Sequence, residues 1–151
     1  MPHRFELPAA EVERAYLIRA AALHPDLAGG TGNDSAALND AKETLLNSEL
    51  RANALLEVLG GPGKGQDRSL PEGFLVEVME VREAAGAAGA SESGRWRAWA
   101  VEKRRGYERD VGAMFAAVAG DRGLLREVRR TLNAWRYIER MIEQLDSGGD
   151  A

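Results

Sequence analysis

Apolar residues recur every three or four positions over most of the chain, which is the spacing of one face of an α-helix. The pattern is clearest over residues 121–146, where a continuous apolar stripe is made by Leu124, Val128, Leu132, Trp135, Ile138, Ile142 and Leu145. A stripe of that length needs another helix to cover it. Weaker patterns of the same period predict helices over about 71–86 and 92–119, and the short Gly120-Asp121 connection makes the last two helices antiparallel neighbours. No segment has the two-residue period of a β-strand, so the pattern predicts an all-α fold.

The amino-terminal third of the chain predicts two further helices joined by a turn. The first, over residues 8–23, must end near His24, because a residue that precedes proline is disfavoured in the α conformation. A loop rich in glycine and asparagine follows, and Asp34 or Ser35 can cap the second helix, which we place over residues 35–47. Two helices in this order form a hairpin.

Residues 60–69, with the sequence GGPGKGQDRS, are the strongest break in the pattern and indicate a linker. They do not match a phosphate-binding loop, because Lys64 is followed by glycine instead of serine or threonine. We therefore expect four segments: a helical amino-terminal domain over 1–61, a linker over 62–70, a three-helix domain over 71–147 and a disordered tail over 148–151.

The composition limits the kinds of partner that the chain can have. Its 151 residues include 24 acidic and 20 basic side chains, for a formal charge of −4, so no overall positive field attracts nucleic acid or anionic lipid. Cysteine is absent, which excludes disulfides, thiolate metal ligation and a cysteine nucleophile. No segment has the roughly 20 apolar residues of a membrane span, and the amino terminus lacks the apolar core of a signal peptide. These features predict a cytoplasmic protein that binds other proteins, with no membrane contact and no cofactor.

A His24-Pro25-Asp26 triplet stands at the turn of the predicted hairpin. A triplet of this kind between two amphipathic helices resembles the J domain, in which it presents a rigid turn to a DnaK-type chaperone. Tyr16 and Val12, eight and twelve residues before the histidine, stand where J domains keep an aromatic and an aliphatic core residue.

Three later segments extend this resemblance to J proteins of the HscB type. Residues 38–61 are similar to the family's third helix, residues 71–83 to the start of its second domain, and residues 135–145 to its closing helix. The sequence thus resembles the HscB-like co-chaperones of iron–sulfur cluster assembly. The resemblance implies a reduced J-domain-like helical hairpin followed by an antiparallel three-helix bundle.

The resemblance also implies an adaptor function without enzymatic activity. In the family, the J domain stimulates the ATPase of a DnaK-type chaperone, HscA, and the second domain delivers an IscU-type scaffold protein that carries a nascent cluster. We accordingly assign chaperone binding to His24, Pro25, Asp26, Arg14 and Arg19. In this assignment Asp26 offers a carboxylate to an arginine of the chaperone, and Pro25 fixes the turn so that little entropy is lost on docking.

Helical geometry predicts a second surface. Four residues of the predicted 71–86 helix share one face and can seat it on the bundle: Phe74, Val78, Val81 and Ala85. Three other apolar residues, Leu75, Val76 and Met79, point away from that face, and Tyr137 lies outside the stripe of the last helix. These four residues match the positions where the family binds its scaffold protein. The alternative is that packing within the bundle, or against the amino-terminal domain, covers them.

The helix before the triplet departs from the family pattern because it is poor in positive charge. Arg14 and Arg19 are its only basic residues, and Leu17 and Ile18 stand where the family has polar or basic residues. A basic face normally guides a J domain to an acidic surface of its chaperone. The alternative function is therefore a degenerate J-like module that binds proteins without regulating a chaperone. The segment before Leu7 is also too short for the first helix of an ordinary J domain.

Two other chemistries are disfavoured. Residues 93–110 mix basic and aromatic side chains, but the helical spacing of Trp96, Trp99 and Tyr107 indicates an amphipathic helix instead of a nucleic-acid surface. His24 is not expected to bind a metal or to act in catalysis, because no second histidine and no cysteine stands in a segment predicted to be structured. The sequence indicates neither the oligomeric state nor the identity of the chaperone and client.

Overall fold

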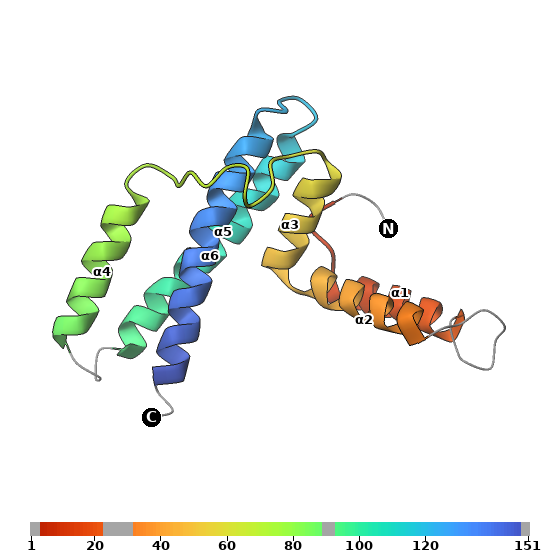
Figure 1. The fold of residues 1–151 in the computed structure, drawn as a ribbon, viewed down its shortest axis with the longest axis horizontal. Coiled ribbons are helices and arrows are strands. Elements are labelled where there is room, and N and C mark those ends of the chain that lie inside the picture. Colours follow the sequence, from red (N-terminus) through yellow and green to blue (C-terminus); the bar gives the residue numbers. More distant parts are fainter. Residues whose placement is uncertain (1–3, 23–31, 89–92, 149–151) are drawn as a thin grey trace. The chain divides into compact units, whose positions relative to one another are not determined.

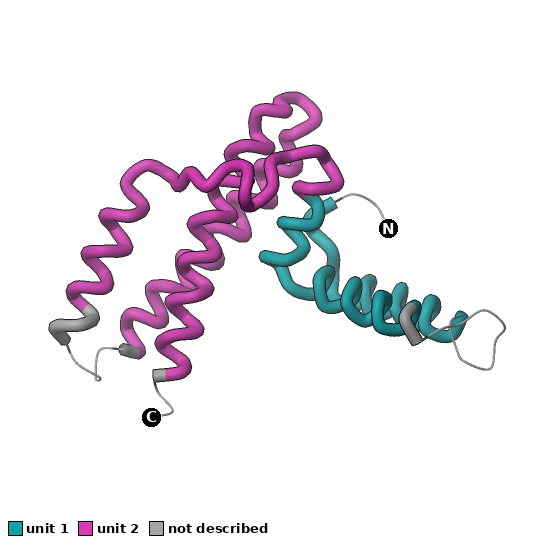
Figure 2. Tube along the Cα trace, in the orientation of Figure 1, with its two compact units in different colours: residues 1–55 teal, residues 56–151 magenta. Residues whose placement is uncertain are grey.

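The computed structural model describes residues 4–22, 32–88 and 93–148, and within these ranges it contains six helices and no strand. The helices are α1 (Ala9–Ala22), α2 (Gly32–Leu46), α3 (Ser48–Val58), α4 (Phe74–Ala88), α5 (Ser93–Ala117) and α6 (Leu124–Gly148). The predicted all-α fold is confirmed. The chain divides into two compact units, residues 1–55 and residues 56–151, and each is described by itself (Figure 2).

In the first unit, α1 and α2 lie side by side as the predicted hairpin (Figure 1). Val12 is buried on the inner face of α1. The Tyr16 hydroxyl donates a hydrogen bond of 2.7 Å to Oδ1 of Asn39, and Lys42 Nζ lies 3.2 Å from Oε2 of Glu13. Across these contacts the numbering rises along α1 as it falls along α2, so the two helices are antiparallel.

The limits of the hairpin helices differ from the predicted ones by a few residues. α1 starts one residue later than predicted, and residue 23 lies outside the described residues. α2 begins at Gly32, ahead of the predicted cap at Asp34 or Ser35. Asp34 instead lies in the first turn, where a carboxylate interacts favourably with the positive end of the helix dipole.

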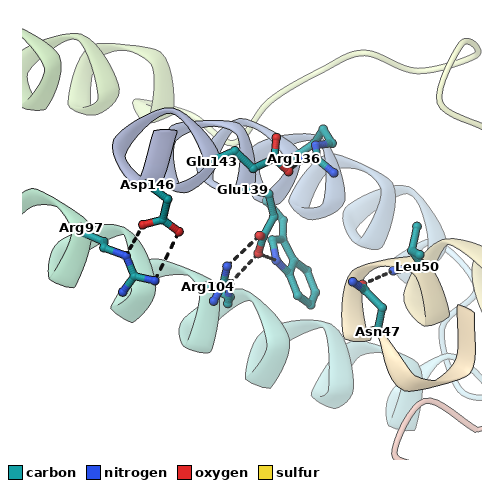
Figure 3. Close-up of polar contacts among 9 residues, drawn as sticks. Asn47, Leu50, Arg97, Arg104, Arg136, Glu139, Glu143 and Asp146 are labelled. Carbon is teal, nitrogen blue, oxygen red and sulfur yellow. Dashed lines mark hydrogen bonds and ion pairs between the residues drawn. The ribbon is translucent and has the colours of Figure 1, made fainter. Parts of the chain in front are cut away.

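Asn47 separates α2 from α3. Its Oδ1 accepts a hydrogen bond of 3.0 Å from the backbone N–H of Leu50, three residues further on (Figure 3). This is the geometry of a helix N-cap, and it satisfies one of the backbone donors that the first turn leaves free. The new helix therefore starts directly after the old one, near the predicted end of the second helix at residue 47.

The segment before α1 forms no helix over residues 4–8. Phe5 is nevertheless buried. The Arg51 side chain holds it, since Nε donates a hydrogen bond of 2.6 Å to the carbonyl oxygen of Phe5 and the guanidinium lies 4.9 Å from the centre of the phenyl ring. Nη1 of Arg51 also donates a hydrogen bond of 2.7 Å to the carbonyl oxygen of Leu45. One arginine thus fastens both the amino-terminal segment and the end of α2.

The second unit is built on α5 and α6, which pack along their length (Figure 1). Two ion pairs give their direction: Arg97 with Asp146, and Arg104 with Glu139. The numbering again rises on one helix as it falls on the other, so the predicted antiparallel arrangement is confirmed. Most of the predicted α6 stripe is buried, namely Val128, Leu132, Trp135, Ile138 and Ile142, while Leu124 and Leu145 are half-buried at its ends.

The Gly-rich segment that follows α3 is bound to α6. The Asn133 side chain donates hydrogen bonds of 3.0 Å and 2.9 Å to the carbonyl oxygens of Asp67 and Ser69. The Arg122 side chain donates a hydrogen bond of 2.7 Å to the carbonyl oxygen of Leu59. The compact second unit accordingly begins at residue 56 and includes the segment that the sequence marks as a linker.

Candidate functional site

The first candidate surface is the outer face of α4. Phe74 and Val78 are buried, and they turn the opposite side of the helix outward. Leu75, Val76 and Met79 are 48%, 61% and 67% exposed. The predicted exposure of these three side chains is therefore confirmed, and their role in binding a client remains a prediction.

The inner face of α4 rests on aromatic rings of the other two helices. The Phe74 ring meets Tyr107 of α5 and Tyr137 of α6 edge to face, with ring centres 6.4 Å and 5.8 Å apart. Lys103 Nζ lies 2.8 Å from Oε1 of Glu77, and this ion pair together with the contact of Phe74 with Tyr107 shows that α4 runs antiparallel to α5. Burial, together with the nearby charges of Glu77 and Asp110, raises the pKa of Tyr107 to about 12. These contacts hold the inner face of α4 on the bundle, and they thereby determine which face of the helix is exposed.

Tyr137 lies outside the seam between α5 and α6, as its angle on the helix predicts, but it is not free on the surface. Its ring is half-buried and packs against Phe74. The reason is that Phe74 of α4 packs against the ring, which a helical wheel of one helix cannot show. A client contact by Tyr137 stays a prediction, and the ring also supports α4.

A polar cluster that the sequence analysis did not single out joins α5 to α6 (Figure 3). Arg104 donates hydrogen bonds of 2.6 Å and 2.8 Å to the two carboxylate oxygens of Glu139, and the indole N–H of Trp135 donates one of 3.0 Å to Oε1. The burial of Glu139 raises its pKa, but these hydrogen bonds and the charges of Arg104 and Arg136 outweigh burial, so the pKa is lowered overall. The spacing of Trp135 and Glu139, one helical turn apart, is the signal that could have found the cluster.

A carboxyl with a lowered pKa in the folded state stabilises the protein above its unfolded pKa and loses that effect as the pH falls through the folded value. We expect Glu139→Gln to lower the free energy of unfolding at pH 7 by about 1 kcal/mol, because the partly exposed Arg104 leaves the pair open to solvent screening. The difference from the native protein should shrink as the pH falls below about 4, because the unfolded state protonates there first and the folded state follows at its lower pKa. Urea unfolding followed by circular dichroism at several pH values measures it.

Glu143→Gln provides the matched control for that experiment. Glu143 also pairs with an arginine, Arg136, at 2.8 Å, but its side chain is 66% exposed. Exposed pairs contribute little, so this variant should unfold almost like the native protein. Equal stabilities of the native protein and Glu139→Gln at every pH would contradict the assigned role of Glu139.

The second candidate surface is the α1–α2 hairpin, for which we predicted two basic chaperone contacts. Arg14 and Arg19 are both exposed. At about 100° per residue they lie roughly 140° apart around α1, so they do not form one basic face. Arg19 lies on the inner side, beside a cavity of about 60 Å³ whose lining also includes Val12, Tyr16, Leu38 and Lys42.

The His24-Pro25-Asp26 triplet lies in residues 23–31, outside the described residues. Its position along the chain is between the end of α1 at Ala22 and the start of α2 at Gly32. The triplet's role in binding a chaperone therefore stays a prediction, together with the roles of Arg14 and Arg19.

The described part of the chain contains neither a candidate metal site nor a candidate membrane span. No group of three or more histidine, aspartate or glutamate side chains there could hold a metal ion. None of the helices in residues 4–22, 32–88 and 93–148 combines the length and apolar character of a membrane span.

Comparison with known proteins finds similarity in structure but not in sequence. No protein-family model matches the sequence, and no curated protein matches it. Among solved structures, the crystal structure of the human co-chaperone protein HscB matches with a TM-score of 0.78 and 21% identity, over 98% of this chain and 78% of that one. The chain has the HscB fold. The chaperone HscB from Vibrio cholerae matches with a TM-score of 0.69 and 20% identity, over 99% of this chain and 93% of that one.

The HscB-like fold that the sequence resemblance implied is thus confirmed over nearly the whole chain. Identities of 20% and 21% show the fold and not the role of any residue. The hairpin belongs to the first unit, and the outer face of α4 belongs to the second.

Proposed function

We propose that this protein is a co-chaperone adaptor that stimulates the ATPase of a DnaK- or HscA-type chaperone and delivers an IscU-type iron–sulfur scaffold protein to it. The observation that carries the proposal is the HscB fold over 98% of the chain, with the His24-Pro25-Asp26 triplet in the segment that joins α1 to α2. Two solved structures of this fold are a co-chaperone and a chaperone by name.

In this proposal the protein carries out no reaction itself and acts by bringing two proteins together. The chaperone binds at the hairpin, through the Asp26 carboxylate and a turn whose Pro25 has a fixed backbone angle. The scaffold protein binds at the exposed Leu75, Val76 and Met79 of α4. Two modest interfaces on one chain raise the effective concentration of client at the chaperone well above its concentration in solution.

A single-turnover ATPase assay tests the proposal. The DnaK-type chaperones of the same organism are each mixed with ATP, with the native protein, and with or without the purified iron–sulfur scaffold protein. We expect one of them to hydrolyse ATP faster with the native protein, and faster again when the scaffold protein is added. Rates that stay unchanged with every chaperone would contradict the proposal.

A second candidate function is a J-like interaction module that has lost chaperone regulation. The separation of Arg14 and Arg19 on different sides of α1 favours it, because a basic face then cannot form around them. In that case the protein binds the scaffold or another protein through α4, and it has no effect on any chaperone ATPase. Binding of the scaffold protein without ATPase stimulation would decide for this second function.

A further inference from the structure

Basic side chains gather where the Gly-rich segment meets α6. Residues 60–69 and 121–133 together contain six basic and three acidic side chains, for a formal charge of +3, whereas the whole chain has a formal charge of −4. Figure 1 shows the segment after α3 passing across α6, and the Asn133 side chain fastens it there by hydrogen bonds to the carbonyl oxygens of Asp67 and Ser69. This part of the second unit is therefore positive on a protein that is negative overall.

Three of these cations are exposed and make no ion pair within residues 4–22, 32–88 and 93–148, namely Lys64, Arg68 and Arg126. Arg68 stands between the two residues that Asn133 holds, so its backbone is fixed on α6. Lys64 lies in a turn that two backbone hydrogen bonds to the carbonyl oxygen of Gly63 close. Because the backbone of both residues is already ordered, a partner that binds them loses little chain entropy.

The acidic side chains of the two stretches are engaged within the protein. Glu127 pairs with Arg130 at 3.2 Å. Asp67 Oδ1 accepts hydrogen bonds of 2.9 Å and 2.6 Å from the backbone N–H and the hydroxyl of Ser69, and these bonds, with nearby arginine charges, lower the pKa of Asp67. Asp121 accepts a hydrogen bond of 3.0 Å from a backbone N–H two residues further on. Further counter-charge for the three exposed cations has to come from solvent ions or from a partner.

We propose that this basic surface, made by Lys64, Arg68, Arg126 and Arg130, binds an acidic helix of a partner protein. Arg126 and Arg130 stand one helical turn apart on α6, which places them about 6 Å apart along the helix axis. Carboxylates at positions i and i+4 of a partner helix have the same spacing, so two charge pairs can form together. The surface adds a third contact to the two of the proposed function.

The overall charge of the chain favours a short acidic helix over a long polyanion. Nucleic acid or an anionic membrane extends past the basic surface and meets the whole chain, whose formal charge of −4 repels it. A short helix interacts mainly with charges within one Debye length, which is about 10 Å at 0.1 M salt. Within that distance the basic surface dominates.

Fluorescence anisotropy with a labelled peptide and the full chain tests the proposal. The probe is an alanine-based peptide of about seventeen residues with glutamate at every fourth position, which is long enough to populate a helix. The same peptide with glutamine at those positions is the reference. We expect the glutamate peptide to bind about tenfold more tightly than the reference in roughly 0.05 M potassium chloride, and to lose most of that advantage in roughly 0.5 M, where salt screens the charges.

Arg68→Glu with Arg126→Glu should weaken binding of the glutamate peptide about tenfold or more, because two attractions become repulsions. Arg82→Glu with Arg140→Glu is the matched control. It changes the net charge by the same amount at two exposed arginines that make no ion pair within the described ranges. Arg140 lies about 21 Å beyond Arg126 along α6, so the control should bind the peptide almost like the native protein. Arg68→Gln with Arg126→Gln should show a smaller loss, and it covers the case in which the charge-reversed pair unfolds in circular dichroism.

Three results would overturn the proposal. The first is equal binding of the glutamate and glutamine peptides by the native protein. The second is an equal loss of peptide binding in the two charge-reversed variants, which would make the effect one of net charge. The third is tighter binding of a single-stranded DNA of about 20 nucleotides than of the glutamate peptide in the same buffer, which would assign the surface to nucleic acid.

Discussion

Replacing His24 by glutamine should abolish the stimulation of chaperone ATPase while leaving the far-ultraviolet circular dichroism of the protein unchanged. Glutamine is close to histidine in size but cannot present an imidazole. Asp26→Asn should have the same result, because it removes the carboxylate charge with almost no change of shape. Loss of a charge-assisted hydrogen bond to an arginine costs about 2 kcal/mol or more, which is roughly thirtyfold in affinity.

Two matched variants control this experiment. His3→Gln changes the only other histidine of the chain, and Asp40→Asn changes an exposed aspartate of α2. Both should stimulate the chaperone like the native protein. Stimulation that persists at the native level in His24→Gln and Asp26→Asn would remove the triplet from the mechanism.

The pair Leu75→Ala with Met79→Ala should weaken binding of the iron–sulfur scaffold protein about thirtyfold or more. Both side chains are at least 48% exposed on α4. Burying them at an interface would contribute about 1.5 kcal/mol each, and the substitutions remove most of that area. Isothermal titration calorimetry with the purified scaffold protein measures the change.

This second variant should leave the basal stimulation of the chaperone intact, because α4 and the hairpin belong to different compact units. Val58→Ala, which shortens an equally exposed apolar side chain of α3, serves as the binding control. If the scaffold protein binds the Leu75→Ala/Met79→Ala variant as tightly as it binds the native protein, the client surface lies elsewhere.

The sequence predicted best what depends on the periodicity of a single helix. The α6 stripe is buried from Val128 to Ile142, and Leu75 and Met79 are exposed because Phe74 and Val78 occupy the inner sector of the same helix. Each of these results follows from the rotation of about 100° per residue along an α-helix and from the fact that one face of the helix packs on the core.

Features that depend on two elements meeting could not be predicted in the same way. The half-burial of Tyr137 requires knowing that Phe74 of α4 packs against its ring. The hydrogen bonds of Asn133 reach a segment more than sixty residues away, and the pairing of Arg104 with Glu139 joins two helices. The early start of α2 at Gly32 is a local miss, since the preference for capping residues placed the start of the helix two or three residues later, at Asp34 or Ser35.

The attachment of residues 67–69 to Asn133 changes what a run of glycines means in this chain. Glycine-rich segments are commonly the first to be cut by proteases, because cleavage needs several residues of extended backbone to enter the enzyme. Here two carbonyl groups near the end of the run are already engaged, and the carbonyl of Leu59 ahead of it is held by Arg122. The run is therefore held to the second unit near both of its ends, and we expect proteases to cut it less readily than its glycine content alone predicts.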